Sequence, residues 1–152
     1  MIKFHKIAHD VESMFPVLVA EFARQPEIEV LYLYGSRAGG RISPLSDVDL
    51  AVLLSPAVDR FAHSDIHLRM IGEAAKALRT EEVDVQILNK VPVQAQYAIL
   101  KNKKVLFSRD EIRRVNFEAE VISRYLDFGP LLEEHYRAMH ERIQAHATAS
   151  TG

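Results

Sequence analysis

The sequence predicts a small α/β or α+β domain in which one sheet is backed by helices. Three observations carry this prediction. Helix-like and strand-like segments alternate along the chain, two of the strand-like segments are strongly apolar, and 152 residues are enough for one compact core. Because 48% of the residues are apolar and 26% are charged, the composition is that of a globular protein and not of a disordered chain.

The first half of the chain contains a helix and two strands. Residues 11–24 place their large apolar side chains on one helical face, with Ser13 expected near the cap. Residues 28–34 (IEVLYLY) are rich in β-branched and aromatic side chains, which is typical of a strand. Residues 48–54 (VDLAVLL) are apolar on both faces, so we expect a central strand covered from both sides.

The middle of the chain continues with a helix, a strand, a short helix and a short strand. Residues 64–80 carry an apolar stripe at helical spacing, and Ser64 is a candidate cap. Residues 83–88 (VDVQIL) read as a third strand. Residues 92–102 begin with proline and predict a short helix, and residues 104–107 (KVLF) predict a short extended segment.

The last part of the chain is helical in pattern from Asp110 to about His146. Gly129 and Pro130 interrupt this pattern, so we expect two helices joined at a break. The sequence shows neither an internal repeat nor a domain linker.

Composition excludes several classes of protein. A formal net charge of -2 gives no overall attraction to nucleic acid. The absence of cysteine excludes disulfides and thiolate zinc sites. No apolar run approaches the roughly 20 residues that span a bilayer, and the first residues lack the apolar core of a signal peptide. We therefore expect a soluble cytoplasmic protein without a membrane partner.

Two aspartates stand at the start of the expected central strand. Asp47 and Asp49 are two positions apart, so they share a strand face with Cα atoms about 6.5–7 Å apart. A carboxylate in such an apolar environment needs a cation or several donors, and the strand itself supplies neither arginine nor lysine. A divalent cation answers this need, because Mg²⁺ is commonly held by one or two carboxylates together with substrate phosphates. Two acids on one face could bracket a pair of ions roughly 3.5–4 Å apart, so we expect two-metal nucleotidyl transfer.

A third acid, Asp84, points from one face of the next apolar strand. If that strand lies beside residues 48–54, three carboxylates converge. Asp84 would then ligate metal or accept a proton from an attacking hydroxyl group.

The segment before the two acids has the features of a phosphate-binding loop. Gly35 allows close backbone approach to a ligand, and Ser36 offers a hydroxyl group and an amide. Arg37 and Arg41 could supply positive charge to polyphosphate oxygens. A phosphate cradle facing a carboxylate metal site is the layout of nucleotidyl transfer, which depends mainly on positioning and charge neutralisation.

Gly35-Ser36, ten further residues and then Asp47-Val48-Asp49, with Asp84 on a later strand, resemble the DNA polymerase β-like nucleotidyltransferase superfamily. The short chain and the form GSRAGG…SDVDLAV are similar to its minimal nucleotidyltransferase (MNT) branch. The segment NFEAEVISRYLDFGPLLEEHYR further resembles the tail of MntA-type antitoxins, which pair with HEPN ribonuclease toxins in type VII toxin–antitoxin systems.

The resemblance implies a nucleotidyltransferase-fold mixed sheet, with ATP and Mg²⁺ as cofactors. It matches Asp47 and Asp49 to the metal-binding pair, Asp84 to the third carboxylate, and Gly35 and Ser36 to the nucleotide contacts. The implied reaction is transfer of AMP to a tyrosine of a HEPN ribonuclease toxin, which silences the toxin. The implied assembly is a hetero-oligomer with that toxin and without direct nucleic-acid binding.

The resemblance also implies a division of the chain. Residues 1–108 would form the minimal nucleotidyltransferase domain, residues 109–146 a C-terminal helical extension packed on it, and residues 147–152 a frayed tail. Two alternative functions stay open at this point. One is a nucleotidyltransferase acting on a small molecule or a nucleic acid end, and the other is a non-catalytic antitoxin that neutralises its toxin by binding alone.

Overall fold

The computed structural model describes residue 7, residues 9–39 and residues 47–150. Within these ranges one four-stranded sheet has the order β3-β2-β1-β4. Its strands are β1 (Ile28–Tyr34), β2 (Val48–Leu54), β3 (Val83–Ile87) and β4 (Lys103–Ser108). The central strand β1 pairs antiparallel with both β2 and β4, whereas β2 and β3 are parallel. The parallel pair is joined by a helical crossover, as such pairs require, and the predicted sheet backed by helices is thereby confirmed.

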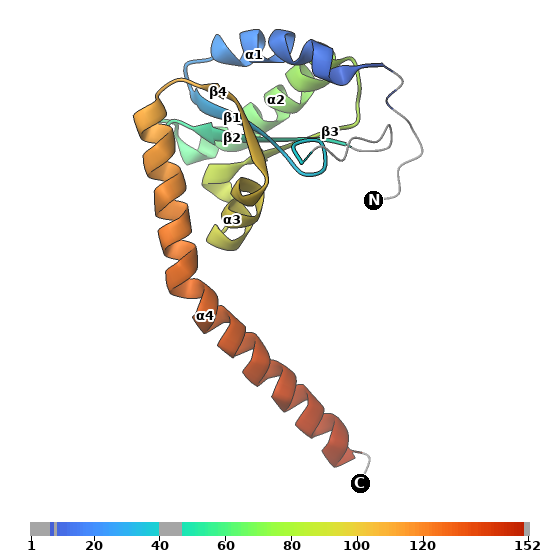
Figure 1. Ribbon diagram of the computed structural model, residues 1–152, viewed down its shortest axis with the longest axis vertical. Coiled ribbons are helices and arrows are strands. Elements are labelled where there is room, and N and C mark those ends of the chain that lie inside the picture. The colour runs from blue at the N-terminus through green and yellow to red at the C-terminus, as the bar shows by residue number, and fades with distance from the viewer. Residues whose placement is uncertain (1–6, 8, 40–46, 151–152) are drawn as a thin grey trace.

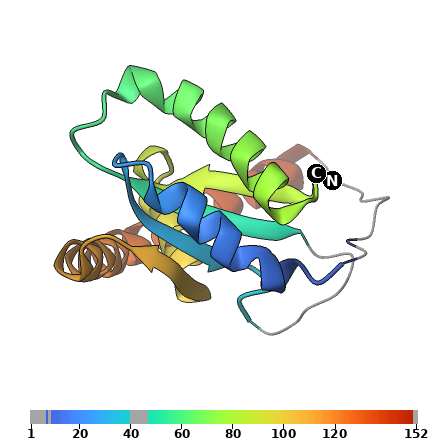
Figure 2. The ribbon, with the colours of Figure 1, turned by 90° about the horizontal axis from the view of Figure 1, so that it is seen from above.

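Helices cover both faces of the sheet. Helices α1 (Phe15–Ala23) and α2 (His63–Leu78) lie side by side across one face, while α3 (Val93–Lys101) and the start of α4 (Glu111–Ser150) lie on the other (Figures 1 and 2). Every residue of β2 except Asp49 is buried, as expected of a strand covered from both sides.

Side-chain alternation divides the core into two apolar clusters. On the α1/α2 face, Leu31 and Leu33 of β1 pack with Leu50 and Val52 of β2. The opposite face is packed by a second cluster, which draws on β1, β2, α3 and α4 and contains Val30, Tyr32, Ala51, Leu53, Leu88, Ile99, Leu100, Phe117 and Val121. Asp49 alternates with Leu50, so its side chain belongs to the α3/α4 face of the sheet.

Short 3₁₀ helices begin both helices of the α1/α2 layer, and neither predicted cap is used. The 3₁₀ helix η1 (Val11–Met14) precedes α1, and the hydroxyl group of Ser13 donates to the carbonyl of Asp10. The 3₁₀ helix η2 (Arg60–Ala62) precedes α2 and is capped by Asp59, which accepts from the amide of Phe61 at 2.9 Å. The expected cap at Ser64 was wrong because the chain enters α2 four residues after this Asp59 cap.

The start of α4 is fixed to the sheet by a cap and by apolar contacts. Asp110 accepts from the amides of Ile112 and Arg113, and Phe117 and Val121 of α4 belong to the second apolar cluster.

Helix α3 begins after a third 3₁₀ helix and packs against α4. This 3₁₀ helix, η3 (Leu88–Lys90), connects β3 to α3, and Pro92 occupies the cap position of α3, as its place in the sequence predicted. The rings of Tyr97 in α3 and Tyr125 in α4 stack with centroids 3.8 Å apart, which holds the two helices together.

Helix α4 does not break where the sequence predicted. It runs without interruption from Glu111 to Ser150 with Pro130 inside it, and it includes residues 147–150, which we expected to be frayed. The prediction of two helices was wrong because an internal proline removes one hydrogen bond and kinks a helix without necessarily ending it. The ribbon changes direction midway along α4 (Figure 1). No helix in the described ranges is long and apolar enough to cross a membrane.

Candidate functional site

The predicted acids lie at one end of the sheet on its α3/α4 face. Asp49 of β2 is the register partner of Asp84 of β3, and its partner on the other side is Tyr34 of β1. Tyr34 in turn pairs with Lys103 of β4. We call these four residues the site row: Asp84, Asp49, Tyr34 and Lys103. Register partners on neighbouring strands point to the same face about 4.8 Å apart, so the pairing brings Asp49 and Asp84 together as expected.

The two acids of the site row differ in exposure. Asp49 is half-buried and Asp84 is exposed at the sheet edge. The side-chain amide of Gln86, two positions after Asp84 on the same face, donates to Asp84 Oδ2 at 3.1 Å. Asp47, half-buried, precedes β2 by one residue and lies two positions before Asp49. The acids therefore range from partly enclosed to open to solvent.

The pKa of the Tyr34 hydroxyl group is shifted by its surroundings, which include the two carboxylates. Burial raises the pKa of the Tyr34 hydroxyl group well above its ordinary value, and the negative charges of Asp49 and Asp84 raise this pKa further. Tyr34 is consequently neutral at physiological pH and keeps its proton. Its phenol is thus a neutral group beside two acids. Sequence reasoning did not single out this tyrosine.

Gly35 is placed directly against Asp49. Its φ of +76° lies in the left-handed region, and a Cβ atom added to it would overlap the Asp49 carboxylate. The amide of Gly39 donates to the carbonyl of Gly35 at 3.3 Å, so residues 35–39 form a single turn of helical type. Ser36 is exposed in that turn. Gly35, the first residue of the predicted phosphate loop, therefore lies against Asp49, the predicted metal ligand.

Arg37 does not reach into solvent as a phosphate-binding arginine would. Its side chain is 3% exposed and forms an ion pair with Glu12 of η1, Nη1 to Oε1, at 2.6 Å. This pair ties the turn after β1 to the segment that precedes α1. A nucleotide-binding role for Arg37 stays a prediction, and Arg41 lies outside the described residues.

The ion pair between Arg37 and Glu12 is expected to support the loop structurally. Glu12→Gln should lower the free energy of unfolding by about 1–3 kcal/mol, because it leaves a buried guanidinium with one charged partner fewer. Urea denaturation measures this loss of stability. Titration with nucleotide then distinguishes a structural role of Arg37 from a phosphate-binding role. A structural arginine predicts weaker nucleotide binding in Glu12→Gln, whereas an arginine released to bind phosphate predicts tighter binding.

The donor set suits a hard cation held jointly with a substrate. Asp47 and Asp49 offer carboxylate oxygens, and the missing side chain of Gly35 leaves room for the Asp49 carboxylate beside the loop. Among the described residues no group of three or more His, Cys, Asp or Glu side chains is arranged to enclose a metal. Mg²⁺ does not require such a cage, since it commonly keeps water and binds substrate phosphates beside one or two carboxylates. The residues therefore fit Mg²⁺ bound together with a polyphosphate.

Sequence comparison assigns the class of protein. Residues 18–112 match the family model described as polymerase beta, nucleotidyltransferase. This match spans α1 to the start of α4 and includes the whole site row. The chain belongs to this nucleotidyltransferase family. No curated protein matches its sequence.

Solved structures with the same fold come from toxin–antitoxin complexes. One is a toxin–antitoxin with AMP-PNP, which is 22% identical with a TM-score of 0.62 over 88% of this chain and 98% of the other. Another is a complex of a tri-AMPylated Shewanella oneidensis HEPN toxin with an MNT antitoxin, which is 19% identical with a TM-score of 0.63 over 89% and 99% of the two chains. A mutant of the toxin–antitoxin MntA-HpeT is 20% identical with a TM-score of 0.62 over 90% and 99%. This chain therefore shares its fold over nearly the full length of those chains.

Proposed function

We propose that this protein is an antitoxin that transfers AMP from ATP to a tyrosine of a HEPN ribonuclease toxin and thereby inactivates it. The observation that carries the proposal is the pairing of Asp49 with Asp84 across two parallel strands, with Gly35 packed against the Asp49 carboxylate. These residues are close together, and this supports the roles that we propose for them as metal ligand, proton acceptor and start of a phosphate loop.

The residues divide the work of the proposed reaction. Gly35 and Ser36 would hold the phosphates through backbone amides and the serine hydroxyl group. Asp47 and Asp49 would hold Mg²⁺, which when bound neutralises charge on the phosphates. The tyrosine oxygen of the acceptor attacks the α-phosphorus of ATP, the bond to the β-phosphate oxygen breaks, and pyrophosphate leaves. Asp84 is exposed and is our candidate to take the acceptor's proton.

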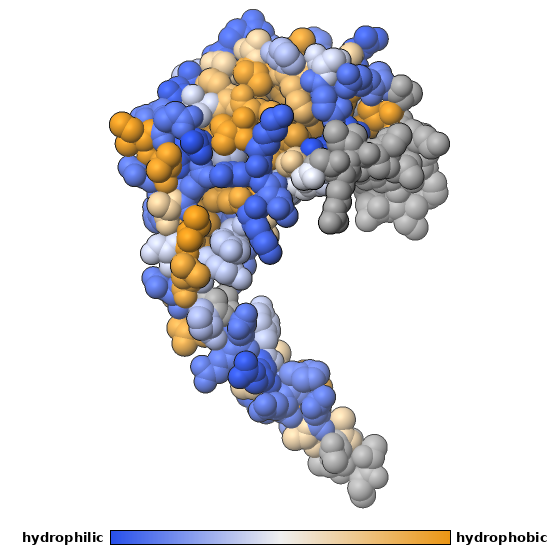
Figure 3. Space-filling model, in the orientation of Figure 1, coloured by the Kyte–Doolittle hydropathy of each residue, from blue (hydrophilic) through white to orange (hydrophobic). Residues whose placement is uncertain are grey.

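The choice of a protein acceptor is supported by the second half of the chain. Of the α4 side chains that the structure describes, only Phe117 and Val121 are buried. Large apolar side chains stay exposed along the helix, and they are Ile112, Val115, Ile122, Leu126, Phe128, Leu131, Tyr136, Met139 and Ile143. Several gather on the visible face of α4 (Figure 3). Such a surface is typical of protein–protein contact, and the neighbouring folds come from complexes of toxin and antitoxin.

Intact-mass measurement tests the proposal. The protein, the HEPN-family product of its neighbouring gene, ATP and Mg²⁺ are mixed, and both proteins are weighed. We expect an AMP-sized mass increase on the partner, with loss of its ribonuclease activity. Toxin neutralisation without any mass increase would instead identify an antitoxin that acts by binding alone. AMP transfer to a small molecule or a nucleic acid end, with the partner unmodified, would place the activity in the alternative class of nucleotidyltransferases.

A further inference from the structure

Lys103 brings a positive charge into the site row from a strand that the sequence motifs do not include. It is the first residue of β4 and the register partner of Tyr34, which immediately precedes Gly35. Two strand spacings place its Cα atom about 10 Å from that of Asp49. A lysine side chain has a long, flexible stem, so its ammonium group can approach a polyphosphate held at Gly35.

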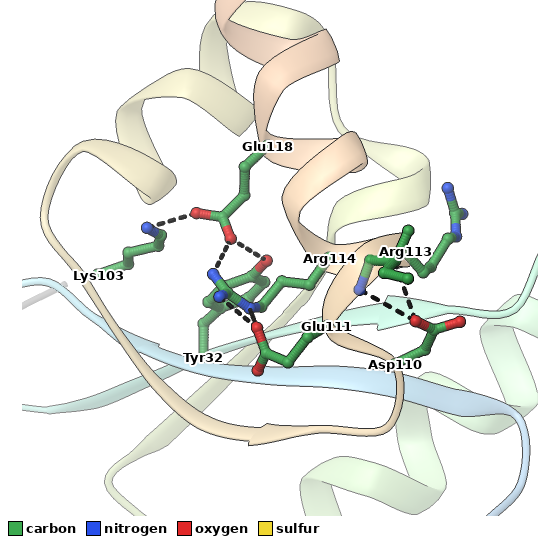
Figure 4. Close-up of polar contacts among 8 residues, drawn as sticks. Tyr32, Lys103, Asp110, Glu111, Arg113, Arg114 and Glu118 are labelled. Atoms are coloured by element: carbon green, nitrogen blue, oxygen red, sulfur yellow. Dashed lines mark hydrogen bonds and ion pairs between the residues drawn. The ribbon is translucent and has the colours of Figure 1, made fainter.

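The ammonium group of Lys103 is held by Glu118 of α4. Glu118 Oε1 pairs with Lys103 Nζ, while Glu118 Oε2 accepts from Arg114 and from the hydroxyl group of Tyr32, the latter at 3.4 Å (Figure 4). Arg114 also pairs with Glu111 one turn earlier. Glu118 would therefore keep two donors, both at Oε2, if Lys103 moved away, and its half-buried carboxylate would still be paired with Arg114.

Lys103 is also the member of this cluster that can move. Arg114 is fixed by two carboxylates of its own helix, and Tyr32 is fully buried in the central strand. Lys103 starts a strand, its side chain is 26% exposed, and its ion pair with Glu118 joins two different elements. An incoming polyphosphate carries more negative charge than the single Glu118 carboxylate, which favours transfer of the lysine to the phosphate.

We propose that Lys103 is a nucleotide-binding residue, and that Glu118 holds its ammonium group until the phosphates of the nucleotide compete for it. This inference rests on the proposed nucleotidyl transfer and deepens it, because it adds a cation to the phosphate side of the site. It also links the nucleotide site to α4, the helix that carries the exposed apolar surface.

Binding of α,β-methylene ATP tests the inference, since this analogue cannot release AMP. Titration of the full chain in the presence of Mg²⁺ should show a Kd about tenfold higher for Lys103→Gln and near the wild-type value for Lys103→Arg. Glu118→Gln should lower the Kd, because it frees the lysine while Arg114 and Tyr32 still have an acceptor. A structural ion pair without a binding role would instead shift both variants in the same direction or leave both unchanged.

Two neighbouring lysines serve as matched controls. Lys101 ends α3, and Lys104 pairs with Leu33 and so faces the other side of the sheet. Both are exposed. Lys101→Gln and Lys104→Gln should leave the Kd near that of the wild type. A tenfold higher Kd in either variant would contradict the proposed contact and indicate a general electrostatic effect. Loss of analogue binding in the wild-type protein would overturn the nucleotidyl-transfer proposal itself, whereas normal wild-type binding with an unchanged Lys103→Gln would overturn only this inference.

Discussion

Asp49→Asn is expected to abolish transfer of AMP to the partner, lowering the rate at least about a thousandfold. Asparagine keeps the shape of the side chain but removes the charge that would hold Mg²⁺ beside the phosphate loop. The fold should survive, because the substitution also removes the repulsion between Asp49 and its register partner Asp84. Intact-mass measurement of the partner over time gives the rate.

Asp65→Asn is the matched control for this experiment. Asp65 is an exposed aspartate in the first turn of α2, remote from the site row in the fold, and its loss should leave the transfer rate unchanged. Urea denaturation should show that each variant loses at most about 1 kcal/mol in free energy of unfolding relative to the wild type. Wild-type transfer by Asp49→Asn would contradict the assignment of this carboxylate.

Gly35→Ala is expected to damage both stability and activity. At a φ of +76° an L side chain is strained, and the new methyl group would also occupy the space of the Asp49 carboxylate. We expect a loss of about 1–3 kcal/mol in the free energy of unfolding from the backbone strain alone. AMP transfer should fall further than the stability loss explains, since Asp49 must turn away from the loop to admit the methyl group.

Gly72→Ala offers the opposite outcome from the same chemical change. Gly72 lies within α2, and apart from its chain neighbours and the adjacent backbone of the helix, no atom lies within 4 Å of a Cβ added there. Alanine should therefore stabilise the helix by roughly 0.5–1 kcal/mol without altering transfer. Urea denaturation of the two variants side by side measures the contrast. Equal stability for both variants would contradict the expected strain of an alanine at position 35.

The helices and strands could largely be predicted from the sequence, because each one depends mainly on residues that are close together in the chain. The β-branched and aromatic content of IEVLYLY and the two-sided apolar character of VDLAVLL are each read from neighbouring residues, and both strands formed as expected. Helix ends were less predictable, since Asp59 caps the preceding 3₁₀ helix η2, while α2 begins at His63 without a side-chain cap and has Ser64 inside it. The predicted break at Pro130 was wrong because a proline destabilises a helix locally, and the turns on either side of it can remain helical.

The site was predictable only in part, because part of it depends on strand pairing. Asp47 and Asp49 are close in sequence, and the nearness of Asp84 followed once its strand was assumed to lie beside β2. Nothing local brings Lys103 to Tyr34, since their contact depends on where the chain returns after α3. The ion pair of Arg37 with Glu12 was missed likewise, because its partner precedes α1 and lies outside every motif.

The order of strands in the sheet has a consequence for synthesis of the chain. Strand β1 (Ile28–Tyr34) lies between β2 and a strand made much later, β4 (Lys103–Ser108). While β4 is still inside the ribosome, one edge of β1 presents unpaired amides and carbonyls, which is a template for wrong pairing with another nascent chain. Release of residue 108 is therefore the step at which this edge of β1 becomes paired, and a ribosome stalled before it leaves a central strand exposed.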